Sequence, residues 1–264
     1  WYDGYGEVGG VIFFTQVITE RKELELKLET QRNELQRSNQ DLEQFAYAAS
    51  HDLQEPLRAV SGCAQILSDK YGLEFDSMGD ELIRHIVEGA ERMKMLINDL
   101  LTYSRVNNGE TFTNVDTDKV VQEVLTLLGD AVTESSAVVR WDRLPPVVGD
   151  RSQLRQLFQN LIGNALKYRS DKTPEIEISV GEHDSRYWRF SIADNGIGID
   201  PKYLSRIFGI FQRLHTRVEY PGTGIGLALC MKIVTRHGGK LWVDSALGRG
   251  ATFKFTIPKG MEGN

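Results

Sequence analysis

The sequence has few of the features that mark secreted, membrane-spanning or nucleic-acid-binding proteins. Its only two cysteines, Cys63 and Cys230, lie far apart in apolar surroundings, which predicts reduced thiols in a cytoplasmic chain. No apolar run approaches the ~18 residues that a membrane-spanning helix needs, and no signal peptide is recognisable. The net charge is −6, and the 31 basic and 37 acidic residues are interspersed. Without a basic stripe, nucleic-acid binding is not expected.

The start of the chain predicts the end of a larger domain. Residues 1–19 contain two short strand-like segments around a Gly-rich turn. A lone hairpin is marginal in water, and the first residue is Trp1 rather than Met. We therefore expect a fragment of a longer protein, which leaves room upstream for a sensor domain or a membrane anchor.

Residues 20–109 predict a helical hairpin. Apolar residues recur at heptad spacing at Leu28, Leu35, Leu42 and Ala49. The complementary heptad positions are less regular, with Leu24, Gln31, Ser38 and Phe45. This coiled-coil seam continues through Leu53, Leu57, Val60, Ala64 and Leu67. A second amphipathic helix is expected at about 78–106. A seam of this length has no large enough partner in one chain, so we expect two hairpins to form a four-helix bundle in a parallel homodimer.

The rest of the chain predicts a separate α/β sandwich domain. The expected helices lie at 117–134, from Asp150 onward, and at 225–237. The expected strands lie at 137–142, 175–180, 187–193, 241–245 and 251–257. Gln153 follows Asp150 at the spacing of a capping box.

His51 is the first candidate for chemistry. It lies two residues past Ala49, about 200° around a helix, so we expect it to point away from the seam. Five residues later, Pro56 should cost ~3 kcal/mol in a helix interior. A defect of that cost beside an exposed nucleophile indicates function.

Two segments of the second domain are suited to holding a nucleotide. Asn160, Asn164 and Lys167 share one face of a helix whose other face is apolar. Two Gly-rich turns follow, one after Asp194 and one opening a helix, where backbone N–H groups can bind phosphate. A Rossmann fingerprint is excluded because no strand precedes the second turn, and no P-loop is present.

Five motifs stand in order along residues 20–258: "SHDLQEP", "NLIGNALKY", "DNGIGI", "IFGIFQRLH" and "GTGIGLAL". This set resembles the H, N, G1, F and G2 boxes of two-component sensor histidine kinases, and the H box is most similar to the PAS- and phytochrome-linked subgroup. The resemblance implies a PAS remnant over 1–19, with Val17 in place of the usual Asp. It also implies a dimerisation and phosphotransfer hairpin with its coiled-coil linker over 20–109, and an ATP-binding domain of the Bergerat type over 110–264.

The resemblance implies that ATP phosphorylates His51, which Asp52 would orient and deprotonate, and that an aspartate of a separate response regulator then receives the phosphoryl group. Asn160 would bind Mg²⁺, and Asp194 would accept from the adenine amino group. The two aromatics Phe208 and Phe211 would either anchor a lid over 201–221 or be ordinary core residues. The remaining implied ATP-binding residues are Asn164, Lys167, Tyr168, Gly196, Gly198, Gly222, Thr223, Gly224, Gly226 and Leu227.

Two alternatives stay open: an ATPase of the gyrase and chaperone type, and a non-catalytic phosphotransfer scaffold. Related clamp ATPases carry a glutamate base where Asn160 stands, and an amide cannot take a proton, so we expect slow ATP hydrolysis. Glu55 stands where kinases that also dephosphorylate their partner often carry Thr or Asn, so phosphatase activity is not predicted. The remaining histidines are expected to be structural or solvated: His85, His183, His215 and His237.

Overall fold

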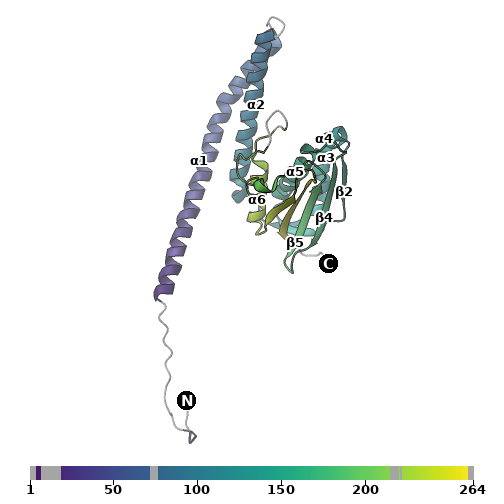
Figure 1. Cartoon of the computed structure of the whole chain (residues 1–264). Helices are drawn as coiled ribbons and strands as arrows, with labels where there is room; N and C mark the ends of the chain where they lie inside the picture. Colours follow the sequence, from purple (N-terminus) through teal and green to yellow (C-terminus); the bar gives the residue numbers. More distant parts are fainter. Residues whose placement is uncertain (1–3, 7–18, 72–76, 215–219, 221, 261–264) are drawn as a thin grey trace. The chain divides into compact units, whose positions relative to one another are not determined.

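The computed structural model describes residues 4–6, 19–71, 77–214, 220 and 222–260. It describes the backbone alone for residues 19–21, 32, 35, 36, 38–52, 70, 71, 77 and 108. A helical part precedes an α/β sandwich, which confirms the predicted fold class (Figure 1). The chain divides into two compact units, Trp1–Phe45 and Ala46–Asn264. In the first unit, residues 4–6 form a turn, and the strands expected around it lie outside the described residues.

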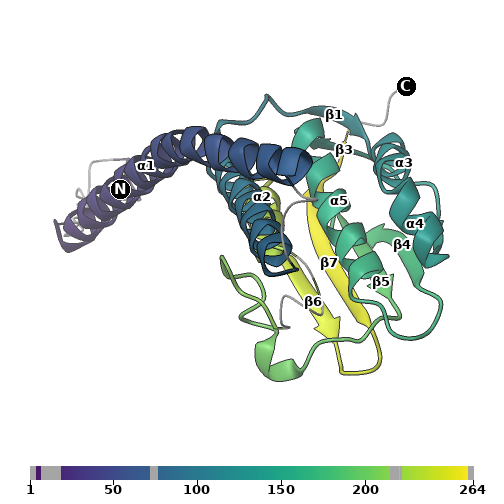
Figure 2. The same ribbon diagram turned by 90° about the horizontal axis from the view of Figure 1, so that it is seen from above.

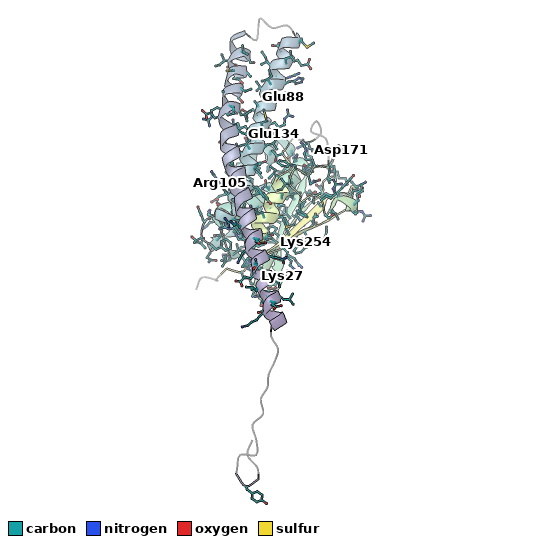
Figure 3. All side chains as sticks on the ribbon, turned by 90° about the vertical axis from the view of Figure 1, so that its left-hand side faces the viewer. Lys27, Glu88, Arg105, Glu134, Asp171 and Lys254 are labelled. Carbon is teal, nitrogen blue, oxygen red and sulfur yellow. The ribbon has the colours of Figure 1, made fainter. Side chains whose placement is uncertain are left out.

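Two long helices form the helical part. Helix α1 spans Thr19–Tyr71 and is continuous through Pro56, although proline lacks the N–H that would pair with the carbonyl of residue 52. Helix α2 spans Ser77–Arg105 (Figure 3) and leads into a short 3₁₀ helix, η2, at Val106–Asn108. The bounds of α2 agree with the sequence prediction to within one residue. None of the helices within the described residues is long and apolar enough to cross a membrane.

The apolar stripe of α1 splits between two directions. Leu57 is 7% exposed because it packs against Ala90 and Ile97 of α2. Part of the predicted seam therefore packs within the chain. A second set at heptad spacing is 45–56% exposed: Leu53, Val60 and Leu67.

A five-stranded sheet with the order β2-β4-β5-β7-β6 forms the second layer. Its strands are β2 (Val138–Trp141), β4 (Glu175–Glu182), β5 (Tyr187–Asp194), β6 (Leu241–Ser245) and β7 (Ala251–Pro258). Strand β2 is parallel to β4, and the other pairs are antiparallel. Alternate residues face the core and are buried, among them Ile176, Ile178, Phe190, Ile192 and Phe255.

Helices α3 (Thr117–Leu127), α5 (Arg151–Lys167) and α6 (Gly226–Arg236) cover this apolar face (Figure 2). Phe158 of α5 packs edge-on against Phe190 and Phe255, with ring centroids 5.9 and 5.6 Å away. Burying each such side chain contributes ~1.5–3 kcal/mol, so α5 is fixed firmly on the sheet.

Two short features differ from the prediction. The helix expected at 117–134 is two helices, α3 and α4 (Gly129–Ser135), because the chain turns at Leu128 just before a glycine. A two-stranded antiparallel sheet, β1 (Thr113–Asp116) with β3 (Pro146–Gly149), was not predicted. Four-residue strands carry too few residues for an alternating pattern to stand out.

The start of α5 is capped differently from the predicted capping box. The Asp150 side chain accepts from the N–H groups of Ser152 and Gln153, as expected. The reciprocal half is wrong, because the Gln153 amide donates to the Val106 carbonyl at 2.8 Å. The Asp150 N–H instead donates to Nε2 of His237 at 3.0 Å.

Arg236 and His237, at the end of α6, complete this junction. Arg236 Nη1 lies 3.0 Å from Asp150 Oδ2, and Nη2 donates to the Glu110 carbonyl at 3.0 Å. Burial lowers the pKa of His237, and the neutral ring suits a site where Nε2 accepts a hydrogen bond. The segment after α2 is thereby attached to α5 and α6.

Candidate active site

One face of α5 carries the polar residues singled out by the sequence. Asn160, Asn164 and Lys167 are partly exposed, whereas residues on the opposite side, such as Leu157 and Leu161, are fully buried. Spacings of four and three residues place the polar side chains in one row. They line a single cavity, here called the Lys167 cavity.

The Gly-rich turn before α6 closes against this row. A Cβ atom at Gly222 would lie 2.8 Å from Lys167 Nζ, and one at Gly226 would lie 3.2 Å from Asn160 Oδ1. Gly222 and Gly224 have φ of 143° and 80°, which favours glycine. The turn thus brings backbone close to α5 where side chains would not fit. Thr223, Gly224, Gly226 and Leu227 line the Lys167 cavity together with Gly222.

A second cavity, here called the Asp194 cavity, adjoins the first. It is mostly apolar, with Ile197, Ile199 and Phe253 in its wall. Both cavities are lined by Asn164, Tyr168, Ile207, Gln212 and Leu227. The two therefore form one continuous site, apolar at one end and polar at the other.

Asp194, at the end of β5, is the acidic group of the apolar end. Burial raises the pKa of its carboxyl above the usual value, although two hydrogen bonds offset part of that effect. Those bonds go to Oδ1 from the N–H groups of Gly196 and Ala251, at 2.9 and 3.2 Å. Among the described residues Oδ2 has no hydrogen-bond partner, so it is available to a donor in the cavity.

The glycines after Asp194 have different positions. Gly198 lines the Asp194 cavity and has a φ of 71°. Gly196 is buried and does not line either cavity, because it packs where a Cβ would meet the Tyr168 carbonyl. Its N–H supports the Asp194 carboxyl, and its contact with a ligand stays a prediction.

The two lid aromatics are also divided. Phe208 is half-buried against the core, whereas Phe211 is 56% exposed with a φ of 61°. Neither side chain lines the Asp194 or the Lys167 cavity. The role of both aromatics as lid anchors stays a prediction. The neighbours of Phe211, Gln212 and Arg213, line the Asp194 cavity instead; both belong to the F-box motif, which could have indicated them.

His51 and Asp52 lie on α1, in the stretch described by its backbone alone. Three residues after His51, the Gln54 side chain donates to Asn98 Oδ1 of α2 at 3.0 Å. The next residue of α2, Asp99, accepts a hydrogen bond from Thr223 Oγ1 and lines the Lys167 cavity. Sequence reasoning missed Gln54, although it belongs to the "SHDLQEP" motif. It also missed Asn98 and Asp99, since nothing in the pattern of α2 distinguishes them from surface residues.

The donor set favours a hard cation that brings other ligands with it. Within the described residues no three His, Cys, Asp or Glu side chains lie together as a metal site. The Asn160 side chain points to the Lys167 cavity with its Nδ2 buried and without a partner. A single amide oxygen beside a phosphate-sized cavity fits Mg²⁺, which keeps several water and phosphate ligands.

Two family models match the chain. The first is the His Kinase A (phospho-acceptor) domain at residues 41–109. The second is the histidine kinase-, DNA gyrase B- and HSP90-like ATPase at residues 149–261. The first contains α2 and His51, and the second contains every residue that lines the two cavities except Asp99.

The chain is similar to several sensory proteins. It is 48% identical to cyanobacterial phytochrome A of Nostoc sp. over 86% of this chain and 30% of the relative. It is 31% identical to the adaptive-response sensory kinase SasA of Prochlorococcus marinus over 92% of this chain and 68% of the relative. The crystal structure of full-length ShkA in complex with AMPPNP matches with a TM-score of 0.66 and 27% identity, over 84% of this chain and 47% of that chain. The chain thus spans under a third of the phytochrome.

Proposed function

The chain belongs to the two-component sensor histidine kinases, and on that premise we propose that it transfers the γ-phosphoryl group of ATP to His51. The observation that carries the proposal is the continuous site on the sandwich domain. Its apolar end suits an adenine ring, and its polar end has the Lys167 ammonium and the N-terminus of α6, both of which favour phosphate.

Each end of the site has a proposed role. Oδ2 of Asp194 accepts from the adenine amino group, since the carboxyl is held by two backbone N–H groups and keeps one oxygen free. Lys167 and Asn164 hold the phosphates, and the backbone of the Gly222–Gly226 turn approaches them closely. The AMPPNP in the ShkA structure, an ATP analogue, supports ATP as the ligand.

Asn160 would hold Mg²⁺ through its amide oxygen. When bound, the ion would neutralise phosphate charge. The side chain of Asn160 is an amide, which cannot take a proton from a water molecule. This favours transfer to a side chain over hydrolysis, and therefore a kinase over the clamp-ATPase alternative.

In the proposed reaction a nitrogen of neutral His51 forms a bond to the γ-phosphorus while the bond from that phosphorus to the ADP oxygen breaks. Asp52 takes the proton that the other ring nitrogen loses. The Gln54–Asn98 hydrogen bond supports a connection between the helix of His51 and the site, because Asn98 precedes Asp99 of the Lys167 cavity. From phosphohistidine, the group would pass to an aspartate of a response regulator.

We also propose that two copies of the chain associate through the helical hairpin. Leu53, Val60 and Leu67 of α1 are exposed, as are Ile86 and Met93 of α2. Large exposed apolar stripes usually mark an interface. A second hairpin would bury them in a four-helix bundle.

Incubation of the chain with γ-labelled ATP and Mg²⁺ tests the kinase reaction. We expect an acid-labile phosphoprotein whose label maps to His51, no label in His51→Gln, and normal label in His85→Gln, a control at an exposed histidine of α2. Steady ATP turnover without phosphoprotein would favour the clamp ATPase. Neither turnover nor label, with ATP bound, would favour the scaffold.

A further inference from the structure

The Lys167 cavity contains an acidic group that the proposed reaction does not use. Asp99 comes from α2, outside the sandwich domain, and its carboxylate accepts a hydrogen bond from the Thr223 hydroxyl. Thr223 lies in the turn between Gly222 and Gly224, where backbone and side-chain donors converge. A carboxylate oxygen bound to Thr223 uses a donor that could otherwise serve a phosphate oxygen.

The charges around Asp99 affect which ligands the Lys167 cavity can bind. Lys167 and the N-terminus of α6 favour an anion in the cavity, and in the described arrangement the anion is Asp99 itself. The phosphates of an entering nucleoside triphosphate carry charge of the same sign as Asp99. The site is partly enclosed, so salt screens the repulsion between them only weakly. The adenine end is lined by different groups, and Asp99 is not among them.

Helix α2 is attached to the sandwich domain at a second point as well. Lys232 of α6 donates to the Tyr103 carbonyl at 2.9 Å, and its ammonium lies 4.4 Å from the Tyr103 ring centroid. Tyr103 follows Asp99 by one helical turn. Asp99 is therefore held at the cavity by the packing of its own helix, in addition to the bond with Thr223.

We propose that Asp99 determines the affinity of the site for phosphate-bearing ligands, by competing with a phosphate oxygen for Thr223 and by repelling phosphate charge. This inference rests on the proposed nucleotide site. Binding of ATP and docking of Asp99 exclude one another, so the two equilibria are coupled and each weakens the other to the same degree. A movement of α2 that withdraws Asp99 raises ATP affinity, and bound ATP favours the withdrawn position.

Calorimetric titration of the whole chain with ATP and with adenosine tests this. Asp99→Asn keeps an oxygen that can accept from Thr223 but removes the charge. We expect ATP affinity to rise roughly tenfold, as for removal of one like charge from a partly screened site, and adenosine affinity to change less than about twofold. The gain should shrink at high salt. Glu88→Gln, which removes an exposed charge elsewhere on α2 (Figure 3), should leave both affinities unchanged.

Four results would overturn the inference. Unchanged ATP affinity in Asp99→Asn, with ATP bound by the unaltered chain, would remove Asp99 alone and leave the nucleotide site standing. A lower ATP affinity that appears with Mg²⁺ and disappears with chelator would make Asp99 a metal ligand instead. Failure of both the unaltered chain and Asp99→Asn to bind either ligand would refute the nucleotide site itself. An equal gain for adenosine and ATP would indicate a structural effect and would also contradict the inference.

Discussion

The guanidinium of Arg236 forms an ion pair with the fully buried carboxylate of Asp150, with Nη1 3.0 Å from Oδ2. Burial alone would raise the pKa of Asp150. Hydrogen bonds from Ser152 and Arg236 outweigh that effect and hold the pKa below its usual value. Because Asp150 also caps α5, this pair stabilises the helix that carries Asn160 and Lys167.

Replacing Arg236 with methionine should destabilise the fold strongly. The buried carboxylate loses its partner, and we expect a loss of about 3 kcal/mol in the free energy of unfolding at pH 7. A lowered pKa in the folded state gives stability that is present above the unfolded pKa and is lost as pH falls through the folded value. The difference between the two proteins should therefore shrink as pH falls below about 4. Urea unfolding at pH 7 and at lower pH measures both effects.

Arg151→Met is the matched control, because Arg151 pairs with Glu123 at the surface, where both side chains are 45–46% exposed. Exposed pairs contribute less than about 1 kcal/mol. An equal loss in the free energy of unfolding in the two variants would show that the buried Arg236–Asp150 pair contributes no more than an exposed pair.

Asp194→Asn should separate stability from ligand binding. Burial raises the pKa of Asp194 in the folded state. The free energy of unfolding therefore falls as pH rises from the unfolded pKa to the folded pKa, and it stays lower above that value. Asparagine keeps an oxygen for the Gly196 and Ala251 N–H groups without the buried charge. We expect an unchanged or higher Tm at pH 7, together with ATP affinity reduced at least tenfold, which corresponds to about 1.4 kcal/mol.

Scanning calorimetry and ATP titration of the same preparation check the two parts. Asp171→Asn, at an exposed position of the same domain (Figure 3), should alter neither quantity. Full ATP affinity in Asp194→Asn would remove Asp194 from the nucleotide site.

Leu53 and Leu57 should respond differently to substitution although they lie one turn apart. Leu57→Ala should cost about 2–3 kcal/mol of stability, because it leaves a cavity against Ala90 and Ile97. Leu53→Asp should convert dimers to monomers in light scattering, since it places a charge in the exposed stripe. Leu28→Asp, the same change nearer the N-terminus of α1, should leave the dimer intact. A dimeric Leu53→Asp variant, or a monomeric unaltered chain, would refute the proposed bundle.

The sequence predicted the features that depend on local periodicity. Asn160, Asn164 and Lys167 could be assigned to one face because a helix fixes the spacing of its side chains. The heptad positions predicted α1 and an amphipathic stripe predicted α2, but periodicity alone does not say whether Leu57 finds its partner within the chain or in a second copy. The burial of Leu57 and the exposure of Leu53 depend on where α2 packs, which the pattern does not show.

The missed features depend on contacts between distant segments. Asp99 and Thr223 are 124 residues apart, and an acidic residue on an amphipathic helix resembles any solvated charge. Gln153 had the local spacing of a capping box, but the Val106 carbonyl was the stronger competitor for its amide. Such competition is decided by tertiary structure, which the local pattern does not contain.

Three hydrogen bonds between the sandwich domain and the segment from Tyr103 to Glu110 use the main chain of that segment. Lys232, Gln153 and Arg236 donate to the carbonyls of Tyr103, Val106 and Glu110. Every residue type has a carbonyl, so these acceptors survive most substitutions of the residues that provide them. The three residues that supply these carbonyls can therefore diverge in sequence without loss of this attachment, whereas the three donors on α5 and α6 must be retained.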